Sequence, residues 1–85
     1  MKAIILYHPQ SEHGTTIESF YREFNQLHNK QISLVSLETI DGAKYAELYQ
    51  IKQYPAVIVS QDDGSYKKDW QGAMPLMDEL SYYLD

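Results

Sequence analysis

The sequence contains no cysteine among its 85 residues. This excludes disulfide bonds, thiolate nucleophiles, iron–sulfur clusters and cysteine-ligated zinc sites. Basic residues are also few, with 7 Lys and Arg against 12 Asp and Glu, and the formal net charge is -5. Because binding to phosphate groups needs clustered cations, this balance predicts no nucleic-acid partner and no attraction to an anionic membrane surface.

Long apolar runs are missing as well, since none exceeds about five residues and a membrane-spanning helix needs about twenty. Residues 1–4 lead directly into a strand-like segment without an apolar leader, so we expect a cytoplasmic protein. The sequence has no repeat, no low-complexity tract and no linker. We therefore expect a single domain over residues 1–85, built around one core.

Apolar patterning predicts the secondary structure. Continuous apolar runs at residues 3–7 and 55–59 are typical of strands covered on both faces of a sheet. Alternation predicts two more strands, at residues 32–37 and 66–70, and the polar segment 61–65 has the composition of a hairpin turn. Helical spacing predicts helices over about residues 17–29, 43–49 and 73–84.

This pattern also predicts which side chains form the core. The order of elements is βαβαββα, which indicates an α/β fold. Apolar residues from the strands and from the first and last helices should be buried together, namely Ile4, Leu6, Ile17, Phe20, Phe24, Leu34, Val57, Val59, Leu76 and Leu80.

Several landmarks resemble the thioredoxin family over nearly the whole chain. They are the strand ending at Tyr7, the loop YHPQSEHGTT at a helix start, the segment QYPAVIV, and a hairpin that ends in WQG. The resemblance implies a thioredoxin-like four-stranded mixed sheet in the order 2-1-3-4, flanked by three helices. The first and third helices should cover one face of the sheet and the second helix the other. The resemblance also places Pro55 as the family's cis proline.

The reactive positions of that family carry no thiols in this chain. Ser11 and Gly14 stand where the two cysteines of the family would be, so the resemblance implies a redox-inactive domain with no catalytic residue and no cofactor. A serine hydroxyl stays protonated at neutral pH unless a base accepts its proton, and His8 and His13 are the nearby bases. Thiol–disulfide oxidoreductase activity is thereby excluded.

In the thioredoxin family, the residue before the cis proline presents its backbone to an extended peptide, a form of strand addition that needs no cysteine. Tyr54 stands at that position. The resemblance therefore predicts a protein- or peptide-binding module. Its groove is formed by residues of both loops, namely Ser11, Glu12, His13, Gly14, Tyr54 and Pro55.

The loop residues also allow simpler interpretations. Ser11 could cap the helix, or Thr15 could do so together with Glu18 in a capping box. His8, Glu12 and His13 carry donor groups suited to a metal ion, but their spacing matches no metal-binding motif, and we predict no metal site.

Two other functions stay open as alternatives. The chain resembles some glutathione transferases in having a serine at this position, which implies that Ser11 could donate its hydroxyl to the thiolate of bound glutathione. The eight tyrosines and one tryptophan could instead form an aromatic surface through which a structural subunit dimerises. We accordingly expect a monomer or a weak homodimer.

Overall fold

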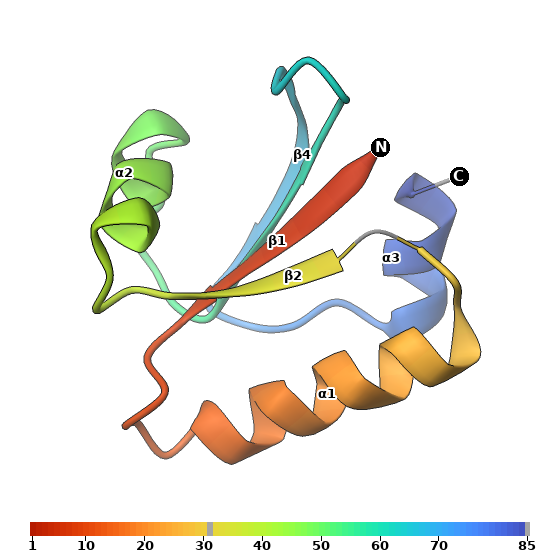
Figure 1. The fold of residues 1–85 in the computed structure, drawn as a ribbon, viewed down its shortest axis with the longest axis horizontal. Coiled ribbons are helices and arrows are strands. Elements are labelled where there is room, and N and C mark those ends of the chain that lie inside the picture. Colours follow the sequence, from red (N-terminus) through yellow and green to blue (C-terminus); the bar gives the residue numbers. More distant parts are fainter. Residues whose placement is uncertain (31, 85) are drawn as a thin grey trace.

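The computed structural model describes residues 1–30 and 32–84, which form one sheet flanked by helices (Figure 1). The elements in chain order are β1 (Lys2–Tyr7), α1 (Gly14–Leu27), β2 (Ile32–Ser36), α2 (Ile40–Leu48), β3 (Ala56–Ser60), β4 (Tyr66–Gln71) and α3 (Met77–Tyr83). The strand order is β2-β1-β3-β4, as predicted. β2 runs parallel to β1, whereas β3 is antiparallel to both β1 and β4.

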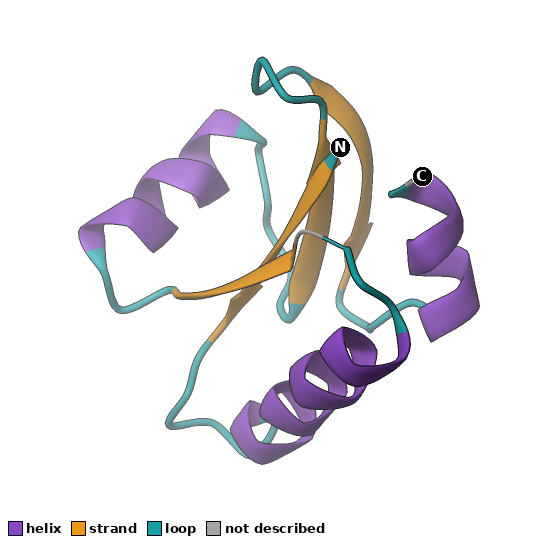
Figure 2. Ribbon diagram, turned by 45° about the vertical axis from the view of Figure 1, so that its right-hand side comes forward, coloured by secondary structure: helices purple, strands orange, loops and turns teal. Residues whose placement is uncertain are grey.

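The central strands β1 and β3 are buried on both faces, as their continuous apolar runs predict. On one face, the side chains of Ile5 and Val57 pack in a cluster with residues of α1 and α3. On the other face, Ile4 and Ile58 pack against Tyr45 of α2. Figure 2 shows α1 and α3 on one side of the sheet and α2 on the other. The predicted distribution of helices is confirmed.

Most of the predicted core is confirmed. The prediction that Leu76 is buried is wrong, because its side chain is 77% exposed. The helix α3 begins only at Met77, and Leu76 is its N-cap, with an extended backbone (φ -67°, ψ 149°). Ala73 and Pro75 lie in the segment that connects β4 to α3, so they are not helical either. The helical spacing of apolar residues therefore extends into a connecting segment that is not helical, and α3 is shorter than predicted.

The helix α2 begins with the kind of cap that its sequence favours. The Thr39 hydroxyl accepts the backbone N–H of Gly42 at 3.0 Å. Gly42 is buried, and a Cβ at this position would lie 2.1 Å from the Ser36 carbonyl oxygen, so the close approach of α2 to β2 requires glycine. Among the described residues, no helix combines the length and apolar character needed to cross a bilayer.

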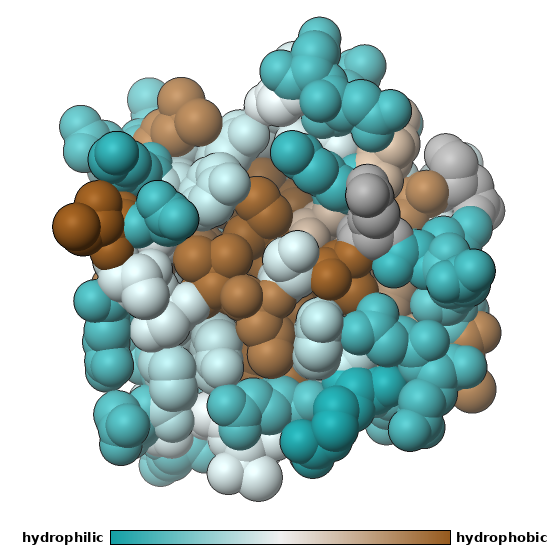
Figure 3. Space-filling model, viewed as in Figure 1, coloured by the Kyte–Doolittle hydropathy of each residue, from teal (hydrophilic) through white to brown (hydrophobic). Residues whose placement is uncertain are grey.

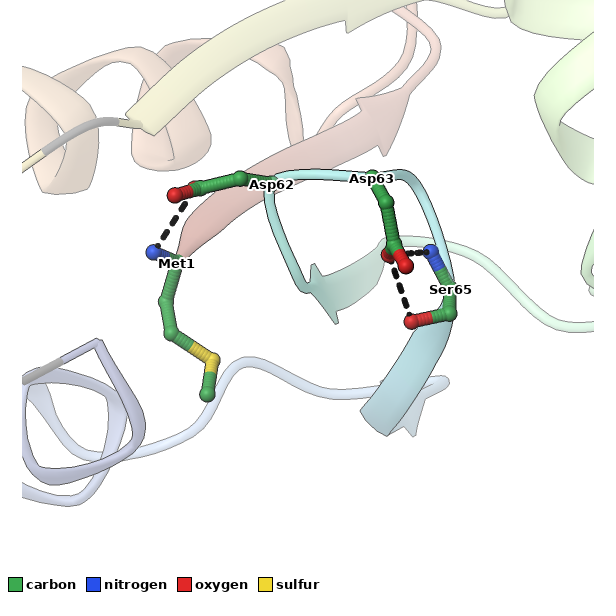
Figure 4. A network of polar contacts seen from close by, with 4 residues as sticks. All are labelled: Met1, Asp62, Asp63 and Ser65. Carbon is green, nitrogen blue, oxygen red and sulfur yellow. Dashed lines mark hydrogen bonds and ion pairs between the residues drawn. The ribbon is translucent and has the colours of Figure 1, made fainter.

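The hairpin between β3 and β4 is closed by the polar contacts in Figure 4. The Asp63 carboxylate accepts the backbone N–H of Ser65 at 3.0 Å and its hydroxyl at 2.7 Å. These hydrogen bonds, the backbone one foremost, lower the pKa of Asp63. The Met1 ammonium group lies 3.0 Å from the Asp62 carboxylate and so joins the start of β1 to this turn. The predicted hairpin is confirmed.

The contrast between two leucines near α3 provides a test of the core. Leu80 is fully buried, so Leu80→Ala should lower the free energy of unfolding by about 2 to 5 kcal/mol. Leu76→Ala is the matched control and should change it by less than about 0.5 kcal/mol. Urea denaturation followed by circular dichroism measures both values, and equal losses in the two variants would contradict this placement of α3.

Candidate functional site

The loop between β1 and α1 consists of two consecutive turns. The His8 carbonyl accepts the backbone N–H of Ser11 at 3.1 Å, and the Ser11 carbonyl accepts that of Gly14 at 3.1 Å. Pro9 is second in the first turn, while Ser11 and Gly14 are first and last in the second turn. These are positions that Pro, Ser and Gly favour. The sequence SEHG is thus a turn that leads into α1.

The Ser11 hydroxyl holds this loop together. It donates to the His8 carbonyl oxygen at 2.7 Å and accepts the backbone N–H of His13 at 3.2 Å. No hydrogen bond joins the hydroxyl to an imidazole ring in the part of the chain that the structure describes. A nucleophilic serine needs a base as partner, so the geometry gives Ser11 a role in shaping the loop.

Both capping interpretations are wrong. The N-cap of α1 is His13, and its side chain makes no cap hydrogen bond to any residue that the structure describes. Ser11 bonds to groups that precede the helix, and Thr15 is already inside the helix. Glu18 faces β1 instead, where its carboxylate accepts the Tyr7 hydroxyl at 3.0 Å.

The candidate metal ligands do not converge. Across residues 1–30 and 32–84, no three His, Asp or Glu side chains gather at a place that could hold a metal ion. Glu12 and His13 are both exposed, with 3.9 Å between carboxylate and imidazole, and the ring of His8 turns towards Tyr54.

Gly14 is buried, whereas its neighbours in the loop are accessible. A Cβ on Gly14 would lie 2.3 Å from the Pro9 carbonyl oxygen, so the first turn of α1 approaches the loop too closely for any other residue. Gly14 thus shapes the backbone, and the accessible side chains at this place are those of Ser11, Glu12 and His13.

The second loop leads from α2 to β3 and is fastened to the end of β4. The side-chain oxygen of Gln71 accepts the backbone N–H groups of Lys52 at 2.9 Å and Gln53 at 3.3 Å. The Tyr54–Pro55 peptide bond follows and is cis, as predicted. Sequence reasoning missed Gln71, because only the pairing of β3 with β4 brings the end of β4 beside this loop.

The two loops meet through an aromatic contact. The rings of His8 and Tyr54 are arranged edge to face, with their centroids 5.6 Å apart. Within residues 1–30 and 32–84, no hydrogen bond uses the backbone N–H or C=O of Tyr54. We call residues 8–13 and 52–55 the loop pair. The loop pair brings Ser11, Glu12 and His13 to the same end of the sheet as Tyr54 and Pro55.

Among the described residues, six of the tyrosine and tryptophan side chains form two separate groups of ring contacts. The first group lies around α2 and β4, with ring centroids 6.5 Å apart in each of its two contacts, and consists of Tyr45, Tyr49 and Tyr66. The second lies where β4 faces α3 and consists of Trp70, Tyr82 and Tyr83. The Lys68 ammonium group lies 5.6 Å from the centre of the Trp70 ring, so a cation covers part of the second group.

No protein-family model matches the chain, and no curated protein matches it significantly. The accessible loop side chains, the lack of cysteine in the sequence, and the Tyr54 backbone groups without a partner among the described residues are the features that bear on function.

The Tyr7–Glu18 hydrogen bond predicts how stability depends on pH. Burial first, and then the hydrogen bond and charge of Glu18, raise the pKa of Tyr7 above 10.0. Above that pH the unfolded chain loses the proton while the folded chain retains it. The free energy of unfolding should therefore fall as the pH rises, and this fall should be smaller in Tyr7→Phe.

Urea denaturation between about pH 9 and pH 11 measures the effect. Glu18→Gln serves as the control, because it keeps an acceptor for the Tyr7 hydroxyl and removes the charge. The fall of its free energy of unfolding with pH should be smaller than in the parent protein and larger than in Tyr7→Phe. Equal slopes in the parent protein and in Tyr7→Phe would contradict the assignment.

Proposed function

We propose that this chain is a redox-inactive thioredoxin-like domain that binds an extended segment of a protein or peptide at the loop pair. The support at the level of the fold is the sheet order β2-β1-β3-β4, with two helices on one face and one on the other. This is the arrangement implied by the resemblance to the thioredoxin family. With no cysteine in the sequence, binding is the part of that family's chemistry that the chain can retain.

The observation that carries the proposal is the free backbone of Tyr54. Its N–H and C=O have no partner in the described part of the chain, and they lie just before β3, next to the accessible loop that contains Ser11. A backbone group without a partner is tolerated where solvent or a ligand can reach it. An extended segment that pairs with Tyr54 would satisfy both groups.

The loop pair can contribute to recognition in two further ways. The His8 and Tyr54 rings provide a partly apolar contact for one side chain of the bound segment. Glu12 and His13 are exposed and provide polar contacts. Gln71 supports the arrangement by holding the backbone of residues 52 and 53. Each backbone hydrogen bond to the segment contributes about 0.5 to 1.5 kcal/mol, so we expect weak binding.

The test uses a phage-displayed library of random peptides and then NMR titration of the enriched peptides. The largest amide shifts should occur at Tyr54 and in residues 11–13. Methylation of the peptide nitrogen that bonds to the Tyr54 carbonyl should weaken binding about five-fold, because it removes one donor. Methylation of the next nitrogen along the peptide should have little effect, since alternate groups of a strand face away.

Tyr54→Ala should weaken binding of the same peptides, because it removes the ring contact with His8. Tyr82→Ala is the matched control, since this tyrosine is 75% exposed on α3 and its ring contacts Tyr83. Equal binding by both variants, or no enriched peptide at all, would contradict the proposal. A separate titration with glutathione tests the transferase-like alternative, in which shifts near Ser11 would occur without any peptide.

A further inference from the structure

The strand β2 forms one edge of the sheet, because within residues 1–30 and 32–84 it pairs with β1 alone. Just after it, the N–H of Leu37 donates to the Tyr7 carbonyl at 2.9 Å. Backbone groups alternate sides along a strand, so the N–H and C=O groups of residues 33 and 35 also point towards β1. Ile32 and Leu34 therefore direct their N–H and C=O groups to the open side. These groups form a row that another strand can use.

The two edges of the sheet differ in how they resist strand addition. β4 carries Lys67 and Lys68, and its register against β3 shifts at Val59 and Ser60. Charged side chains and irregular pairing are devices that prevent another strand from docking. β2 has the sequence ISLVS, with neither charge nor proline, and its register against β1 is continuous. The β2 edge is thus the unprotected one.

Apolar side chains border the open edge. Figure 3 shows hydrophobic atoms gathered at the centre of one face, over β2 and between α1 and α2. A hollow of about 700 Å³ lies there, and its lining includes Ile4, Leu34, Val35 and Tyr45. Leu34 and Val35 belong to opposite faces of the sheet, and both side chains are only half-buried. A strand added here would cover apolar surface on both faces.

The charges beside β2 favour an antiparallel neighbour of the same sequence. Lys2 lines the hollow near the start of β2, because it immediately precedes the residue that pairs with Ile32. Asp41 lines the hollow beyond the other end of the strand. In an antiparallel pair of identical strands, the basic end of each copy meets the acidic end of the other.

We propose that β2 is a homodimer interface, at which a second copy adds its own β2 antiparallel about a two-fold axis through Ser33. In this register Ile32 exchanges both backbone hydrogen bonds with Leu34 of the second copy, and Leu34 does the same with Ile32 of the second copy. All the open groups of these two residues are then paired. The two-fold symmetry closes the assembly and produces one continuous sheet across both copies.

The neighbouring register, centred on Leu34, is less favourable. It would pair Ile32 with Ser36 of the second copy and would require the Ser36 carbonyl as an acceptor. That carbonyl already accepts the backbone N–H of Thr39 at 3.2 Å and its hydroxyl at 2.7 Å. The register centred on Ser33 leaves this contact at the start of α2 intact.

A disulfide provides the sharpest test, because the chain has no cysteine of its own. In the proposed register Ser33 faces Ser33 of the second copy in a non-hydrogen-bonded pair, with Cα atoms about 4.5 Å apart. This separation suits a disulfide. Ser33→Cys should therefore form a covalent dimer in a glutathione redox buffer on the order of ten-fold faster than Gln26→Cys, an exposed control on α1.

A charge at the same position should separate the copies. Ser33 is exposed, so Ser33→Lys leaves the monomer folded but places two lysines opposite each other in the dimer. Sedimentation equilibrium should give a dimer dissociation constant at least about five-fold higher than for the parent protein. Gln26→Lys makes the same change of net charge away from β2 and should leave the constant unchanged.

Three outcomes would overturn the proposal. They are a parent protein that stays monomeric up to roughly millimolar concentration, equal cross-linking of Ser33→Cys and Gln26→Cys, and equal effects of the two lysine variants. A chain that stays monomeric and binds an unrelated extended peptide at β2 would also overturn the proposal. The dimer does not use the loop pair, so Tyr54→Ala should leave the dissociation constant unchanged, and either proposal can fail alone.

Discussion

The antiparallel pairing of β1 with β3 is the constraint on which the rest of the structure depends. Both strands are buried on both faces, and Ile5 and Ile58 are completely inaccessible to solvent. Such strands expose apolar surface in two opposite directions, so the chain must supply helices to both faces. α1 and α3 cover one face and α2 the other, and each of these helices contributes to a cluster centred on the same two strands.

The same pairing determines where the accessible features lie. β1 ends next to the start of β3, so the loop after Tyr7 meets the loop before Ala56, and the rings of His8 and Tyr54 come into contact. With β1 and β3 in the middle, β2 and β4 become the edges. The loop pair and the open side of β2 are thus two consequences of one strand order, although they lie on different parts of the surface and offer different groups to a partner.

Polar contacts in this chain serve mainly to fix backbone that the sheet brings close together. Ser11 ties the first loop to the His8 carbonyl, Gln71 holds the second loop, and the Tyr7 hydroxyl joins the end of β1 to Glu18 of α1. Individually these bonds contribute about 1 kcal/mol, far less than the burial of the core side chains. Their effect is on position, because they hold the two loops and the start of α1 in one arrangement around Tyr54.

The sequence alone was sufficient for the fold class, the strand order implied by its resemblance, the helix distribution and most of the core. These features follow from apolar runs and spacing, which reflect burial directly. It also excluded thiol chemistry. Only the tertiary structure decided where α3 begins, that Ser11 closes a turn rather than capping α1, and that Gln71 and Tyr7 support the loops. Only the register of β2 against β1 determined that the backbone N–H and C=O groups of Ile32 and Leu34 point to the open edge. Each of these depends on contacts between residues far apart in the chain, and local patterns of polarity do not encode which distant backbone group a polar side chain will meet.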